Sequence, residues 1–204
     1  MGPTEIGISD QFWEANSQFS PTAFRYESLD EITADAHLIV RGRVVGTQEH
    51  EALPVEDPGG ELTARPVTFG VITINEVLKG VPNILQPGAV LVTRLGSMGQ
   101  ERSELPREEI VIFLKNYEQL AEESGGNGLF GDASDRFYYT RPNGYQAVLR
   151  NINGVVKVIA GPEGWEEALG PYPATLDGQP FDQLLEAIRR SVSSGSLVVS
   201  SVNG

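Results

Sequence analysis

The chain has 204 residues, and 28 aspartates and glutamates against 15 lysines and arginines give it a formal net charge of −13. A surface this acidic repels phosphate backbones and anionic headgroups, so we expect neither nucleic acid nor an anionic membrane as a partner. The chain has no cysteine, which excludes disulfide frameworks, thiolate zinc sites, iron–sulfur clusters and cysteine nucleophiles. Its length suits one domain with attachments that needs no disulfide or metal to fold.

The N-terminal segment, residues 1–25, shows no sustained hydrophobic period and predicts an extended arm. Phe12 and Trp13 stand among polar residues there, and we expect these two aromatics to pack on the main body or on a partner. Ser28 then precedes Glu31 by three residues, which is the spacing of a capping box. This spacing predicts a short helix directly after the arm.

Four β-rich segments follow, and no helical pattern separates them. They cover residues 37–46, 67–79, 89–95 and 109–115. The second segment is apolar on both faces, which is typical of a central or doubly covered strand. Gly42 within the first segment predicts a bend or a bulge. This spacing of strands favours an antiparallel barrel or sandwich over a βαβ sheet.

Two acidic, glycine-containing stretches have no hydrophobic period. They are residues 48–66 and 117–136, and both predict long loops. Further along, Asn153-Gly154 lies between two short apolar segments. This pair tolerates the left-handed backbone of a two-residue hairpin turn, so a β-hairpin is predicted there.

A C-terminal amphipathic helix is predicted, because apolar residues recur there at offsets of three, four, seven and eleven. They are Phe181, Leu184, Leu185, Ile188 and Val192. The tail, residues 194–204, is uncharged and β-prone, and such a strand invites pairing with a sheet edge. The candidate partner-binding residues are therefore Leu197, Val198 and Val199 in the tail, with Phe12 and Trp13 in the arm.

No catalytic constellation stands out in the sequence. A Ser-His-acid set needs a histidine, and the two histidines, His37 and His50, accompany no G-x-S-x-G elbow. Gly126, Gly128 and Gly131 match the G-x-G-x-x-G spacing of dinucleotide-binding turns. Acidic residues on both sides would repel a phosphate, however, and no strand leads into this stretch. No catalytic or cofactor-binding residue is therefore assigned.

Calcium is the one cation that the acidic loops would suit, because it takes oxygen ligands from flexible loops. Asn127, Asp132 and Asp135 are the candidate ligands, and Glu56 and Asp57 lie in the other loop. Their spacing matches no EF-hand. The alternative is that these side chains are solvated loop charges.

A cluster of tyrosines suggests a second kind of site. Tyr138, Tyr139 and Tyr145 are close in sequence and could form a platform on which a sugar or another small ring stacks. The alternative is the entrance of a strand whose alternate rings enter the core.

Three strand motifs carry a family resemblance. They are ADAHLIVRGRV at residues 34–44, ITINEVLKG at 72–80 and EIVIFL at 109–114. These motifs resemble the netrin-like modules, which include tissue inhibitors of metalloproteases and bacterial secreted or lipid-anchored proteins. The resemblance implies a five-stranded OB-like barrel with helices at its ends and an extracytoplasmic address. Protease inhibition in that family uses an N-terminal cysteine, so the resemblance does not extend to that mechanism.

The sequence therefore predicts a mainly β, OB-like or netrin-like antiparallel barrel with a short N-terminal helix and a C-terminal amphipathic helix. The barrel domain covers residues 26–193, between the arm and the tail. No apolar run approaches the ~20 residues that a membrane helix needs, so no membrane insertion is expected.

The favoured function is a non-enzymatic extracytoplasmic module that binds a protein partner or itself through its acidic loops and terminal arms. The alternative is a small-ligand or carbohydrate module that uses the tyrosines. The third hypothesis is a carboxylate-based hydrolase.

Overall fold

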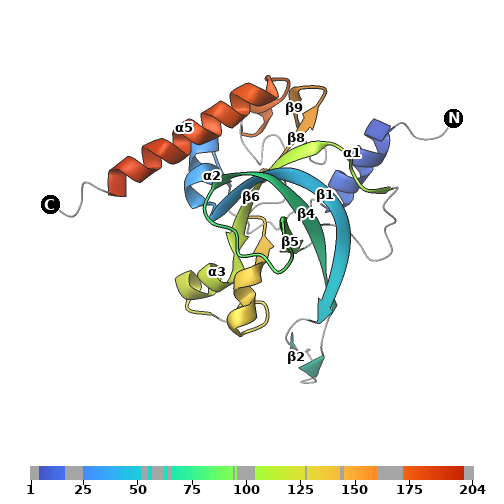
Figure 1. The fold of residues 1–204 in the computed structure, drawn as a ribbon, viewed down its shortest axis with the longest axis vertical. Helices are drawn as coiled ribbons and strands as arrows, with labels where there is room; N and C mark the ends of the chain where they lie inside the picture. The colour runs from blue at the N-terminus through green and yellow to red at the C-terminus, as the bar shows by residue number, and fades with distance from the viewer. Residues whose placement is uncertain are drawn as a thin grey trace.

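The computed structural model describes residues 5–16, 25–51, 55–56, 62–63, 66–93, 95, 104–126, 128–142, 145–159 and 172–199. Within these residues the chain is mainly β, as predicted (Figure 1). The strands are β1 (Leu38–Glu51), β2 (Val55–Glu56), β3 (Leu62–Thr63), β4 (Pro66–Lys79), β5 (Ala89–Thr93), β6 (Glu109–Asn116), β7 (Tyr138–Thr140), β8 (Val148–Ile152) and β9 (Val155–Val158). The α-helices are α1 (Glu5–Asn16), α2 (Leu29–Asp35), α3 (Tyr117–Ser124) and α5 (Phe181–Val199), and the 3-10 helices are η2 (Ala133–Phe137) and η3 (Ala174–Leu176).

Five strands of the main sheet form a closed ring. Its order is β1-β4-β5-β7-β6, and β6 pairs with β1 to complete it. β8 and β9 extend the sheet from β6, and β2 and β3 form a separate hairpin. The ring pairings are antiparallel except that of β5 with β7. This topology excludes a βαβ sheet, as the strand spacing predicts.

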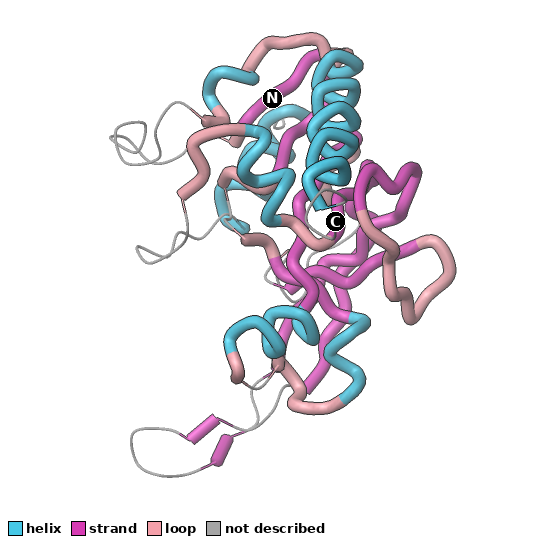
Figure 2. Tube along the Cα trace, turned by 90° about the vertical axis from the view of Figure 1, so that its left-hand side faces the viewer, coloured by secondary structure: helices cyan, strands magenta, loops and turns pink. Residues whose placement is uncertain are grey.

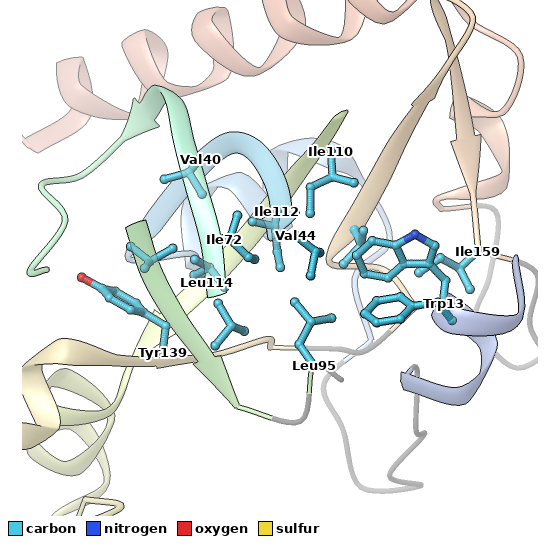
Figure 3. Packing of buried hydrophobic residues seen from close by; sticks show 14 of the residues in the cluster. Trp13, Val40, Val44, Ile72, Leu95, Ile110, Ile112, Leu114, Tyr139 and Ile159 are labelled. Atoms are coloured by element: carbon cyan, nitrogen blue, oxygen red, sulfur yellow. The ribbon is translucent and has the colours of Figure 1, made fainter. Parts of the chain in front are cut away.

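Hydrophobic side chains cover both faces of the sheet, because successive strand residues point to opposite sides. In β1, Val40 packs inside the ring, whereas Ile39 packs outside it against α2 and α5. In β4, Ile72 packs inside the ring, whereas Phe69 lies outside it with side chains from the segment between α3 and η2. The prediction of a central or doubly covered strand is confirmed for residues 69–72, which are buried on both faces, whereas Val77 near the end of β4 is exposed. Figure 3 shows the cluster inside the ring.

Gly42 marks a bulge in β1, as predicted, because the β1–β4 register shifts between Arg41 and Gly42. A Cβ on Gly42 would lie 1.8 Å from the carbonyl oxygen of Thr73 in β4. Gly42→Ala is therefore expected to lower the free energy of unfolding by about 3 kcal/mol in urea denaturation. Gly46→Ala is the control, since no atom lies within 4 Å of its Cβ position. Equal losses from the two substitutions would contradict this close approach of β1 and β4.

The N-terminal segment corrects one prediction, because it contains the helix α1 rather than an extended arm. Phe12 and Trp13 are buried, with exposed fractions of 2% and 0%, and belong to the cluster inside the ring. Figure 3 shows Trp13 in this cluster. The Trp13 indole N–H donates to Glu108 over 2.8 Å. The helix is held by contacts with residues about 95 positions away, which no local sequence pattern reveals. These two aromatics thus pack on the chain's own sheet, one of the two placements expected.

The predicted long loops are also partly structured. Residues 48–51 extend β1 and pair with the start of β4, and the second loop contains α3 and η2. α3 begins directly after β6 because the Asn116 side chain accepts hydrogen bonds from the backbone N–H groups of Glu118 and Gln119. Such a cap satisfies the free N–H groups of a helix start.

The predicted hairpin is confirmed. β8 and β9 pair across a turn in which Asn153 has φ 55° and Gly154 has φ 84°. These left-handed values are the ones that a two-residue hairpin turn requires. The Ser28 cap of α2 is confirmed as well, because the Ser28 hydroxyl accepts from the backbone N–H of Glu31.

The C-terminal amphipathic helix is confirmed as α5, which buries Phe181, Leu184 and Leu185. Figure 2 shows α5 beside α2, against which it packs. The predicted β-prone tail is wrong in its first part, because α5 continues to Val199 and includes Leu197 and Val198. A helix already nucleated by its packed turns propagates through residues of weak helical preference.

Candidate functional site

An exposed apolar loop connects β4 to β5, at residues 80–88. Val81 is 85% exposed, Leu85 48% and Ile84 39%. Among the residues that the structure describes, these are three of the five large hydrophobic side chains that are exposed. Isolated exposed hydrophobics are common, but clustered ones mark interaction sites. We call residues 80–88 the apolar loop, after these three side chains.

The apolar loop is fixed to the sheet at both ends and in its middle. At its start, a Cβ on Gly80 would lie 2.3 Å from the carbonyl oxygen of His37. In its middle, the backbone N–H of Asn83 donates to the hydroxyl of Tyr139 over 2.8 Å. At its end, the carbonyl of Gly88 accepts from a backbone N–H of β4 over 2.8 Å. Side chains on a fixed loop lose little entropy on binding.

An acidic helix lies beside the apolar loop. α3 carries three glutamates and no basic residue. Its Glu123 carboxylate lies 3.0 Å from Nε2 of His37, the residue that Gly80 contacts. Tyr139, which holds the loop, pairs with Asn116, which caps α3. In Figure 1 the loop, in green, passes between α2 and α3.

The apolar loop is not among the sites predicted from the sequence, because the glycines and prolines at residues 80–88 indicate only a break between two strands. The available signal is three large apolar residues within a short connection that is rich in turn residues. Such side chains cannot all be buried in a tight turn, because turns run over the surface.

Two of the three proposed calcium ligands meet at an open cleft of about 340 Å³, lined also by Glu118 and Glu122. Asp135 is buried and accepts from the backbone N–H groups of Phe130 and Gly131. Asp132 accepts from the backbone N–H of Ser134, and hydrogen bonds from the Ser134 side chain and backbone lower the pKa of Asp132. Both carboxylates thus organise their own loop.

The other candidate calcium ligands are Asn127, Glu56 and Asp57. Asn127 and Asp57 lie outside the described residues, and Glu56 lies in β2. Within the part of the chain that the structure describes, no group of three or more acidic or histidine side chains is spaced to hold a metal ion. Calcium binding stays a prediction.

The candidate stacking tyrosines are buried. Tyr138, Tyr139 and Tyr145 are 5%, 2% and 6% exposed. Tyr138 packs outside the ring against Phe69, with ring centroids 4.8 Å apart, whereas Tyr139 packs inside it. Neighbouring rings therefore enter different parts of the core, as expected for the entrance of a strand. These three rings form no exposed platform on which a ligand could stack.

Burial raises the pKa of five tyrosines above the ordinary value. They are Tyr26, Tyr138, Tyr139, Tyr145 and Tyr172. Unfolded tyrosines ionise at about pH 10, whereas these five stay neutral at that pH in the folded protein. The stability from burying them is therefore complete below pH ~10 and is lost as the pH rises further. Tyrosinate absorbance is expected to rise together with the loss of circular dichroism. Because Tyr117 is the one tyrosine outside this group, a rise equal to more than one tyrosine well before unfolding would contradict the burial.

A polar cluster at the C-terminal end of α2 holds two partly buried lysines, Lys79 and Lys115. Lys79 donates to the carbonyl oxygens of Thr33 and Ala34, and burial lowers its pKa. Lys115 binds Asp35 over 2.5 Å. Cations stabilise the carbonyl end of a helix, so these lysines serve the fold.

No family model and no curated protein matches the sequence of this chain. The netrin-like resemblance therefore stays a prediction. No helix in the described segments is long and apolar enough to cross a membrane.

Proposed function

We propose that this chain is a non-enzymatic extracytoplasmic module that binds another protein through the apolar loop. The observation that carries the proposal is that three large apolar side chains are exposed on a loop fixed to the sheet. We further propose that the five-stranded ring is an OB-like barrel. The closure of β6 onto β1 and the resemblance of three strand segments to netrin-like modules support this assignment. The same resemblance supports the extracytoplasmic address.

The proposal moves the contact surface away from the terminal arms. Phe12 and Trp13 are part of the core, so they are not free to bind a partner while α1 is docked. The tail residues up to Val199 continue α5 rather than offering a strand. Within the described part of the chain, the apolar loop remains as the exposed, clustered hydrophobic feature.

The ligand-stacking and hydrolase alternatives find less support. The three tyrosines are buried. At the acidic cleft, hydrogen bonds from backbone N–H groups hold Asp132 and Asp135. The hydrogen bonds to Asp132 lower its pKa and so stabilise its ionised form, whereas a general acid must be held neutral.

The test compares two forms of the full chain as bait for the proteins of its own extracytoplasmic fraction. One is the natural chain and the other carries Val81→Ser, Ile84→Ser and Leu85→Ser. Exposed substitutions of this kind are expected to change the free energy of unfolding by about 0.5 kcal/mol or less each. A partner retained by the natural chain and lost from the variant supports the proposal. Equal retention of every protein by both forms would contradict it.

A further inference from the structure

We propose that the segment bound by the apolar loop carries basic side chains beside its apolar ones. This inference rests on the proposed function, because it names the kind of partner that the same loop takes. Three observations carry it: the loop itself is uncharged, the helix next to it is acidic, and the carboxylates of Asp35 and Glu123 are more exposed than the basic side chains with which they pair.

The charge that faces a partner beside the loop is negative. Glu123 is 55% exposed and Asp35 37%, whereas Lys115, which binds Asp35, is only 14% exposed. Lys79 directs its ammonium group at the carbonyl end of α2. When a partner buries Val81, the edge of its contact surface therefore lies over carboxylates of this chain. Basic side chains on the partner would complement these carboxylates.

The same charge argues against a second copy of this chain as the occupant. A two-fold dimer places the same patch of both subunits against each other. Docking through the apolar loop would bring α3 of each copy, with its three glutamates and no basic residue, near α3 of the other. Each copy also has a net charge of −13. Like charges across an interface oppose association.

The experiment uses three synthetic peptides that share the apolar centre Leu-Ile-Val-Leu. Two lysines, two glutamates or two serines flank this centre on each side. Each peptide is titrated into the full ¹⁵N-labelled chain, and the dissociation constant is taken from amide chemical shifts. The lysine peptide is expected to bind about tenfold more tightly than the glutamate peptide. Its largest shifts are expected at residues 81–86 and 118–123.

Two variants and one control locate the binding. The substitutions Val81→Ser, Ile84→Ser and Leu85→Ser together are expected to weaken the lysine peptide about tenfold. Glu122→Gln with Glu123→Gln is expected to weaken it about threefold, because rim charges contribute modestly. Asp182→Asn with Glu186→Gln removes the same charge from the exposed face of α5 and is expected to change nothing. An equal loss in this control would overturn the proposal, since binding would then follow bulk charge.

Other outcomes also overturn the inference, and they separate it from the proposed function. Equal, loop-dependent binding of all three peptides would keep the loop as a docking site but remove the basic partner. Absence of binding by the lysine peptide would refute the basic partner directly. A further outcome is that the chain sediments with phosphatidylcholine vesicles while the variant with three serines in the loop does not. If, in addition, the three peptides bind equally, the occupant of the loop would be a membrane surface rather than a protein. If the solution mass of the chain rises with its concentration and that of the variant with three serines in the loop does not, the occupant would be a second copy of this chain.

Discussion

Trp13→Ala is expected to lower the free energy of unfolding by about 3–5 kcal/mol, the usual cost of removing a buried aromatic side chain. Trp13 has no exposed surface, and its ring lies edge-on to Phe12 with centroids 5.0 Å apart. For a chain of this size the loss corresponds to a fall in Tm on the order of 10 °C. Urea denaturation and calorimetry measure both quantities.

The matched control for Trp13 is Gln11→Ala, an exposed position of the same helix. It is expected to change the free energy of unfolding by no more than about 0.5 kcal/mol. If Trp13→Ala were as mild as Gln11→Ala, α1 would not be docked on the ring in solution. Phe12 and Trp13 would then return as candidates for partner binding.

Arg150→Leu is expected to cost about 3–5 kcal/mol, because it leaves the buried carboxylate of Glu108 without its cation. Arg150 is 4% exposed, and its Nε lies 2.8 Å from Glu108. It also donates to Asp10 over 2.7 Å and to the Ser9 hydroxyl over 2.9 Å. The pair thus joins the sheet to α1, and chemical denaturation of the variant measures its contribution.

A double substitution tests whether the buried charge causes the loss. Glu108→Gln removes the charge but keeps an oxygen that can accept from Trp13 and Ser9. The double variant, Arg150→Leu with Glu108→Gln, is therefore expected to be more stable than Arg150→Leu alone. Strictly additive losses in this cycle would show that the two side chains do not interact as an ion pair.

The regular elements could be predicted from sequence where local signals agree. β4 is apolar on both faces, Asn153-Gly154 marks a hairpin, and α5 has a continuous apolar stripe. The bulge at Gly42 was predictable in the same way. In each case the residues that set the structure are neighbours in sequence, so periodicity and turn chemistry contain the information.

The rest depends on contacts between distant residues. α1 has only two strongly apolar anchors in its C-terminal half, and its placement requires Glu108 and Arg150. α3 begins without a turn after β6, because Asn116 is both a strand residue and a cap. Tyr138 and Tyr139 look alike in sequence, and only the ring determines which face each one joins.

The candidate site was the least predictable part. Val81, Ile84 and Leu85 are exposed on a loop whose first residue lies close to the His37 backbone and whose middle is held by the Tyr139 hydroxyl. Sequence gives the composition of such a loop but not its exposure. Conversely, the tyrosines and acids that sequence favoured are used by the fold, for packing and for holding loop amides.

Site-specific photo-crosslinking tests the central claim most directly. A photoreactive amino acid replaces Ile84 in one form of the chain and Val45 in another, and both are expressed in the cells that make the protein. Val45 is 36% exposed and Ile84 39%, so the two positions are matched in exposure. We expect one protein, different from this chain, to be joined at position 84 and not at position 45. Equal adducts at both positions, or none at position 84, would contradict the claim that the apolar loop binds a partner.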